Sequence, residues 1–281
     1  MIYFGTAGNP NEFYESFKVS EQMPMYLFSK GLNAYEYQCS RGVKITDKKI
    51  EAIRKEAEKY QIKLSIHAPY YISLSTQQEE KKKATIQYII DTMRVAQKMG
   101  ASEIVVHAGA LLNLEREFAV ESACKLLKQA YQVADELHLG DVIICPETMG
   151  KINQLGDSKE IIRMCQVDER LLPTIDFGHL YCRSLGALNS QEAWENELQL
   201  YIDDLGYDRM RHFHSHFSKM EYTLTGGEKR HVTFQDSSFG PNERDVLSAI
   251  KKLKLEPTII CESAGTQGID ALTLKEIYEN I

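Results

Sequence analysis

Two hydrophobic patterns alternate along the chain. Short apolar runs rich in β-branched residues predict buried strands, and longer stretches with apolar residues every three or four positions predict amphipathic helices. Eight runs are strand candidates: Ile2–Thr6, Ala34–Cys39, Leu64–Ala68, Ile104–Ala108, Val142–Glu147, Leu172–Ile175, His212–Phe217 and Thr258–Glu262. Such repeated β-α units are typical of a parallel sheet covered by helices.

The segments between these runs have helical periodicity. Thr46 can cap a helix whose inward face would carry Ile50, Ile53, Ala57 and Tyr60. Further helices are predicted around 86–96, 117–137, 159–165, 191–202, 243–253 and 271–278. Eight strands in 281 residues favour the α/β class, and within it a (β/α)8 TIM barrel forming one domain over 1–281. A doubly wound open sheet is the alternative, but no GxGxxG follows the first strand.

Composition narrows the class of protein further. No segment approaches 18 apolar residues, and MIYFGTAGNP at the amino terminus lacks the pattern of a signal peptide, so we expect a cytoplasmic protein with no membrane partner. The six cysteines show no CxxC spacing and are expected to be free thiols. A net charge of -7 argues against coating nucleic acid by bulk electrostatics, but not against a cleft whose positive field comes from metal ions. We expect a monomer.

Metal-type side chains stand at the ends of the predicted strands. In a parallel barrel these ends converge around one mouth, where active sites are built. The expected metal ligands are His67, His107, Glu147, Asp176, His179, His214, His231 and Glu262. His138 and His216 are left out, and His212 should point to the opposite face of its strand.

Each of these residues alone has an ordinary explanation, such as a core histidine or a helix cap. If these side chains are buried close together, their desolvation and mutual repulsion would destabilise the fold by several kcal/mol, and bound divalent cations could offset this cost. Mixed imidazole and carboxylate ligands suit zinc, manganese or iron. Eight ligands exceed the need of one ion, so two or three ions sharing a bridging carboxylate are implied. From the residues alone we infer a multinuclear metal hydrolase acting on a phosphoester.

Several motifs sharpen this inference. HAPY at 67–70, HAG at 107–109, PETMG at 146–150, IDFGH at 175–179, HSHFSK at 214–219, RH at 230–231 and CES at 261–263 occur in that order. In this respect the chain resembles the endonuclease IV family of apurinic/apyrimidinic endonucleases, within the wider xylose-isomerase-like barrels.

The resemblance implies three zinc ions, with manganese as the other metal considered. Glu147 would bridge two ions, with His67 and His107 on the first. Asp176, His214 and Glu262 would hold the second ion, and His179 and His231 the third. The expected catalytic residues are Glu147 and Glu262.

The implied reaction is hydrolysis of damaged double-stranded DNA at the phosphodiester 5′ to an abasic site, leaving a 3′ hydroxyl. Tyr70 and Arg41 would contact the DNA at the lesion.

The chain departs from the family pattern in the third ligand of the third ion. The family has an Asp where this chain has Lys229, so either Glu228 substitutes or the third site is weak. HSHFSK also differs from the usual HLNDSK, and VTFQDSSFGP replaces a short turn after His231.

Two other functions stay open. A sugar isomerase or epimerase of the same barrel family would need one ion, held by Glu147, Asp176, His214 and Glu262. A barrel that keeps its metals and binds a damaged end without cutting it is the third possibility.

Overall fold

The computed structural model describes residues 1–281 and confirms the predicted (β/α)8 barrel. Eight parallel strands close in the order β1-β10-β7-β6-β5-β4-β3-β2. They are β1 (Tyr3–Ala7), β2 (Ala34–Gln38), β3 (Lys63–His67), β4 (Glu103–His107), β5 (Ile143–Glu147), β6 (Thr174–Asp176), β7 (His214–Phe217) and β10 (Thr258–Cys261). Each lies within two residues of its predicted limits, because the apolar runs that predict strands are also the runs buried in the barrel.

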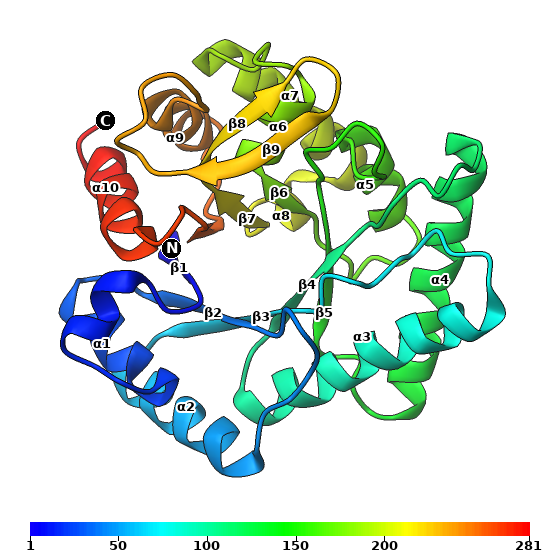
Figure 1. Ribbon diagram of the computed structural model, residues 1–281, viewed down its shortest axis with the longest axis horizontal. Coiled ribbons are helices and arrows are strands. Elements are labelled where there is room, and N and C mark those ends of the chain that lie inside the picture. Colours follow the sequence, from blue (N-terminus) through cyan, green and yellow to red (C-terminus); the bar gives the residue numbers. More distant parts are fainter.

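Helices surround the strands in a ring (Figure 1). They are α1 (Met23–Ser29), α2 (Asp47–Tyr60), α3 (Glu79–Met99), α4 (Arg116–Glu136), α5 (Ser158–Cys165), α6 (Phe177–Arg183), α7 (Gln191–Leu205), α8 (Tyr207–Met210), α9 (Glu243–Lys252) and α10 (Gln267–Glu279), with two short 3-10 turns at Asn11–Glu15 and Ser20–Gln22. Thr46 caps α2 as predicted, since its side chain accepts a hydrogen bond from the Lys49 amide. The inward face of α2 buries Ile50, Ile53 and Ala57, whereas Tyr60 is only half-buried.

Two features near the barrel mouth were not predicted. Helix α6 begins directly after β6, where Asp176 caps it by accepting a hydrogen bond from the His179 amide at 2.8 Å. The segment after β7, for which the sequence offered no strand candidate, forms an antiparallel hairpin of β8 (Lys219–Thr223) and β9 (Gly227–Val232). The hairpin lies across one side of the mouth and packs on α6 (Figure 1).

The six cysteines are free, and all but Cys124 are buried, as expected for structural thiols. None of the helices combines the length and the apolar composition that crossing a bilayer requires.

Candidate metal centre

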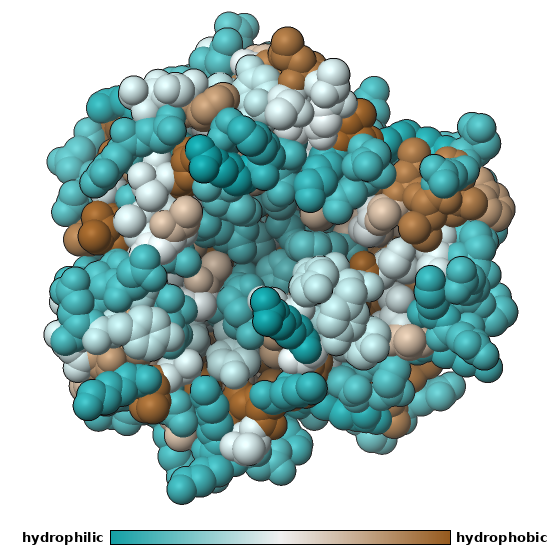
Figure 2. All heavy atoms as spheres, viewed as in Figure 1, coloured by the Kyte–Doolittle hydropathy of each residue, from teal (hydrophilic) through white to brown (hydrophobic).

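Consecutive strand ends bring the predicted side chains to one mouth. His67, His107, Glu147 and Asp176 are the last residues of β3, β4, β5 and β6. Parallel register places His107 directly beside Glu147 on the neighbouring strand. His67, His107 and Glu147 line a hollow of about 320 Å³ with hydrophilic walls at the centre of the face shown in Figure 2, whereas Asp176 is buried and is not among the lining residues. The geometry therefore brings together side chains that are far apart in the sequence.

A first donor group consists of His67, His107 and Glu147, with one possible ligand atom of each within 4.8 Å of the others. Glu147 Oε2 lies 3.4 Å from His67 Nε2 and 3.1 Å from His107 Nε2. His67 Nδ1 donates to the Ala68 carbonyl at 2.8 Å. Because a carbonyl only accepts, this bond fixes the His67 tautomer and leaves Nε2 free to bind an ion.

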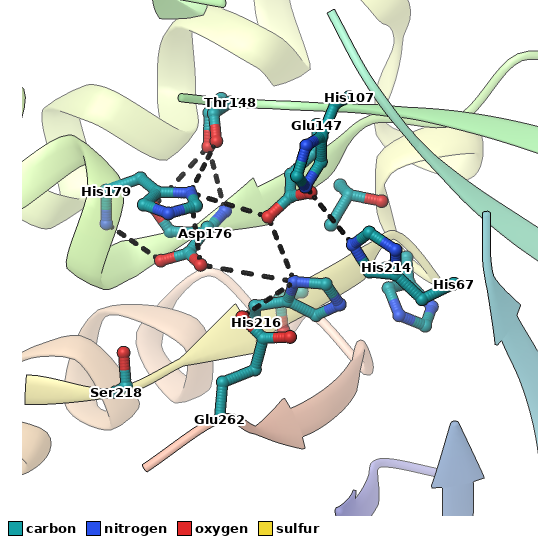
Figure 3. A network of polar contacts seen from close by, with 12 residues as sticks. His67, His107, Glu147, Thr148, Asp176, His179, His214, His216, Ser218 and Glu262 are labelled. Atoms are coloured by element: carbon teal, nitrogen blue, oxygen red, sulfur yellow. Dashed lines mark hydrogen bonds and ion pairs between the residues drawn. The ribbon is translucent and has the colours of Figure 1, made fainter. Parts of the chain in front are cut away.

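A second donor group consists of Glu147, Asp176, His216 and Glu262. His216 Nδ1 lies 3.1 Å from Glu147 Oε1, 4.0 Å from Asp176 Oδ2 and 3.5 Å from Glu262 Oε2 (Figure 3). One oxygen of Glu147 therefore faces each group, which is the arrangement expected of a bridging carboxylate.

His214, predicted as a ligand of this second group, does not lie in it, and His216, left out of the prediction, takes its place. Parallel register pairs Asp176 with His216 and pairs His214 with Thr174, two residues deeper in the barrel. Two residues of strand correspond to about 6.6 Å. The HSH sequence offered both histidines on the same face, and only strand register decides which one reaches the mouth.

A third donor group consists of His179, Glu228 and His231. His179 Nε2 lies 3.5 Å from Glu228 Oε2, while His179 Nδ1 donates to the Thr148 carbonyl at 2.8 Å. His231 Nδ1 is 2.8 Å from the Ser218 hydroxyl, so its Nε2 stays free. Of the two alternatives for the departure at Lys229, this geometry favours substitution by Glu228.

A β-bulge in the hairpin explains how Glu228 reaches the site. Glu221 pairs with Arg230 and Tyr222 pairs with Glu228, so Lys229 is an extra residue without a partner in the ladder. Lys229 and Arg230 both turn outward, and each forms an ion pair with Glu221. Residues three apart on a regular strand face opposite sides, but the bulge places Glu228 and His231 on the same side.

Backbone contact also holds Glu228 in position. The Glu228 amide donates to the Gly150 carbonyl at 3.1 Å, and the Ile152 amide donates to the Gly226 carbonyl at 3.2 Å. A Cβ on Gly150 would lie 2.7 Å from the Glu228 Cβ and 3.1 Å from His179 Cδ2. The loop after β5 can approach the third donor group this closely only because residue 150 is glycine.

The donors strongly perturb one another's pKa. Burial raises the pKa of Glu147, but His216 and His107 outweigh it and hold that pKa well below its usual range. Burial lowers the pKa of His67, yet Glu147 and further carboxylates raise it to about 9. For His179, burial is likewise outweighed by Asp176 and Glu147, which raise its pKa to about 10. Without cations, protons on His67 and His179 therefore offset part of the carboxylate charge.

The donor set suits transition-metal ions. Ligands in tetrahedral zinc sites lie roughly 3.4 Å apart, given metal–ligand distances of about 2.1 Å. Glu147 Oε2 and Asp176 Oδ2 are buried and lack aligned hydrogen-bond partners, a costly state that a bound cation would relieve. The absence of cysteine from all three groups matches a catalytic site better than a structural one.

Of the two predicted DNA contacts, one borders the hollow. Tyr70 lines it and is 60% exposed. Arg41 is exposed but is not among the lining residues, although its neighbour Ser40 is. Lys151 and Gln154, which sequence motifs did not single out, also line the hollow.

Fold and site together define a (β/α)8 barrel protein with a cluster of metal-type donors at the carboxyl ends of its strands. The chain belongs to the xylose isomerase-like TIM barrel family, whose model matches residues 27–278. It is 33% identical over 281 residues to the uncharacterized protein MJ0133 of Methanocaldococcus jannaschii, covering 100% of this chain and 98% of that protein. It is 26% identical over 170 residues to a probable endonuclease 4 of Malacoplasma penetrans, covering 58% of this chain and 57% of that protein.

The fold of this chain is similar to solved structures of an epimerase-like protein and of an endonuclease IV. A D-tagatose 3-epimerase-like protein superposes with a TM-score of 0.69 at 19% identity, covering 99% of this chain and 96% of its own. Endonuclease IV from Thermus thermophilus superposes with a TM-score of 0.67 at 17% identity, covering 93% of this chain and 94% of its own. At such identities the likeness shows the fold alone.

Proposed function

We propose that this protein is a zinc- or manganese-dependent phosphodiesterase of DNA repair that hydrolyses double-stranded DNA 5′ to abasic sites. Of the four groups of possible metal donors, three include side chains that line the hollow at the mouth, and two of these three share Glu147. These three groups carry the proposal. An enzyme using one ion has no evident need for His67, His107, His179 and His231 together. The relation to a probable endonuclease 4 points the same way.

Bound ions would supply Lewis acidity toward the phosphate oxygens and would lower the pKa of water. The side chains set where this chemistry acts. Glu147 and Asp176 are completely buried, whereas the Glu262 side chain keeps 16% of its surface exposed. Glu262 is therefore the carboxylate of the second group best able to meet a water molecule or a substrate. Tyr70 offers an aromatic ring at the mouth against which a base or sugar can pack.

A sugar isomerase or epimerase is the second candidate. One observation favours it: the second donor group, with three carboxylates and one imidazole, is a complete ligand set for one ion without the other two groups. A carboxylate beside that ion could move protons between sugar carbons.

Metal content measured together with cleavage separates the two candidates. With Glu228 completing the third donor group, we expect three zinc or manganese ions per chain in gently purified protein, and cleavage of an abasic duplex that stops on chelation and returns with metal. One ion per chain without cleavage would favour the epimerase. Cleavage that persists after thorough metal removal would overturn both metal mechanisms.

A pair of histidine variants controls for non-specific effects. His107→Asn removes a first-group donor and should lower both ion content and cleavage. His212→Asn changes a histidine whose side chain is 54% exposed and paired with Glu256, so it should leave both unchanged.

A further inference from the structure

A second polar cluster lies inside the barrel beneath the metal centre. It contains Glu36 from β2, Glu103 from β4 and His214 from β7, all buried. His214 Nε2 is 3.0 Å from Glu36 Oε2, and His214 Nδ1 is 2.9 Å from Glu103 Oε2. Lys63 Nζ forms an ion pair of 2.7 Å with the other Glu103 oxygen.

Together with His216, two members of this cluster, Glu36 and His214, form a fourth group of possible metal donors, all of them buried. We expect no ion there, because both ring nitrogens of His214 are engaged in hydrogen bonds with carboxylate oxygens, so the imidazole bridges Glu36 and Glu103. A protonated imidazole and Lys63 would together balance the charge of the two carboxylates. This balance explains how ionised groups can be buried in the barrel interior at tolerable cost.

Glu36 connects this cluster to the metal centre. Glu36 Oε1 lies 3.1 Å from His216 Nε2, which is an ion-pair distance, although the two atoms are not aligned for a hydrogen bond. The opposite edge of the His216 ring carries Nδ1, which faces Glu147. The Glu36 carboxylate is itself held in place, because Ser65 donates to Oε2 at 3.1 Å and Gln38 donates to Oε1 at 3.0 Å. Glu103, by contrast, contacts His214 and Lys63.

We propose that Glu36 is a positioning residue of the metal centre: it holds the Nε2–H edge of His216 inward, so that Nδ1 is presented to an ion in the second donor group. The physical basis is that a carboxylate behind a ligating imidazole fixes its tautomer and orientation and raises its basicity. The proposal rests on the proposed function only in requiring that the second donor group binds an ion.

Cobalt binding to the full-length protein tests the proposal. Glu36→Gln keeps the shape of the side chain but removes the charge that faces His216. We expect the Kd of one Co²⁺ ion per chain to rise roughly 10- to 100-fold, with a change in the visible d–d absorption of that ion, while the other ions bind as before. Isothermal titration and absorption spectra give the two readings.

Glu103→Gln is the matched control. It removes an equally buried carboxylate from the same histidine, so it should destabilise the barrel similarly while leaving the Co²⁺ spectrum and affinity unchanged. If both variants weaken the ion equally, the effect is general destabilisation and the proposal is wrong. If neither weakens it, Glu36 does not position His216. A further ion lost on His214→Gln would also overturn the proposal, by showing a metal within the lower cluster.

If Glu36→Gln does not fold, Glu36→Asp replaces it. Aspartate keeps the charge but withdraws it by one methylene, so the spectrum should again change, and a wild-type spectrum and affinity would overturn the proposal. These readings are independent of DNA: failure of the wild type to cleave an abasic duplex would remove the proposed function and leave this test intact.

Discussion

A methyl group on Gly150 should displace Glu228 and release one ion. In Gly150→Ala the new Cβ would lie 2.7 Å from the Glu228 Cβ, and ordinary contact begins at 3.4 Å, so the two must separate by 0.7 Å (3.4 minus 2.7). The obstructing atom is tied to the backbone of β9 and cannot rotate away as a flexible chain end could. Alanine suits the backbone at position 150, where no left-handed φ is present, so the effect should be steric alone.

The size of the effect follows from metal geometry. Ligand distances tolerate about ±0.2 Å, so a shift of 0.7 Å removes the Glu228 carboxylate from useful range. Disturbing even the residues that support a ligand typically costs 10- to 100-fold in affinity, or about 1.4 to 2.7 kcal/mol, and displacing a ligand should cost at least as much. Crowding a packed site should also lower the free energy of unfolding by roughly 1–3 kcal/mol.

Elemental analysis after dialysis against a mild chelator measures the result. We expect three ions per chain in the wild type and two in Gly150→Ala. Gly226→Ala is the control, since a Cβ at this turn of the same hairpin meets only Thr223 Oγ1, at 3.1 Å, and should leave three ions. Three ions retained in Gly150→Ala would refute the assignment of Glu228 to the third donor group.

Further predictions address the bulge, the protons and the two histidines of β7. Lys229→Asp, which restores the family residue, should not tighten the third ion, because the bulge turns position 229 outward; tighter binding in a metal titration would show that the bulge does not persist. At pH 7.5 the metal-free protein should carry protons on His67 and His179, whose pKa values are raised to about 9 and about 10, so loading should release at least about two protons per chain. Metal affinity should therefore fall as the pH is lowered. Calorimetry in buffers of different ionisation enthalpy measures the number of protons released on metal binding. If no protons are released, His67 and His179 are not protonated in the metal-free protein. His216→Asn and His214→Asn should each lower the free energy of unfolding by roughly 3–5 kcal/mol, because each removes the partner of buried carboxylates. Only His216→Asn should also lose an ion; denaturation with parallel metal analysis measures both effects, and an ion lost from His214→Asn alone would contradict the assignment.

The sequence was sufficient for the barrel and for much of the site. Strands and helices differ in hydrophobic period, so the eight strands could be located within two residues. In a parallel barrel the strand ends meet at one mouth, and this rule alone placed His67, His107, Glu147 and Asp176 together. These inferences succeed because they depend on local pattern and on a single topological rule.

Tertiary structure decided three features of the site: His216 and not His214 lies in the second donor group, Glu228 lies in the third, and Glu36 lies behind His216. His214 and His216 share one face of β7, and pairing with β6 sets which of them reaches the mouth. Glu228 lies in the site because of the bulge in the β8–β9 hairpin and because the backbone at Gly150 packs closely against it. The physical reason is common to all three: residue spacing determines the face on which a side chain lies, but its depth and partners depend on register with strands far away in the sequence.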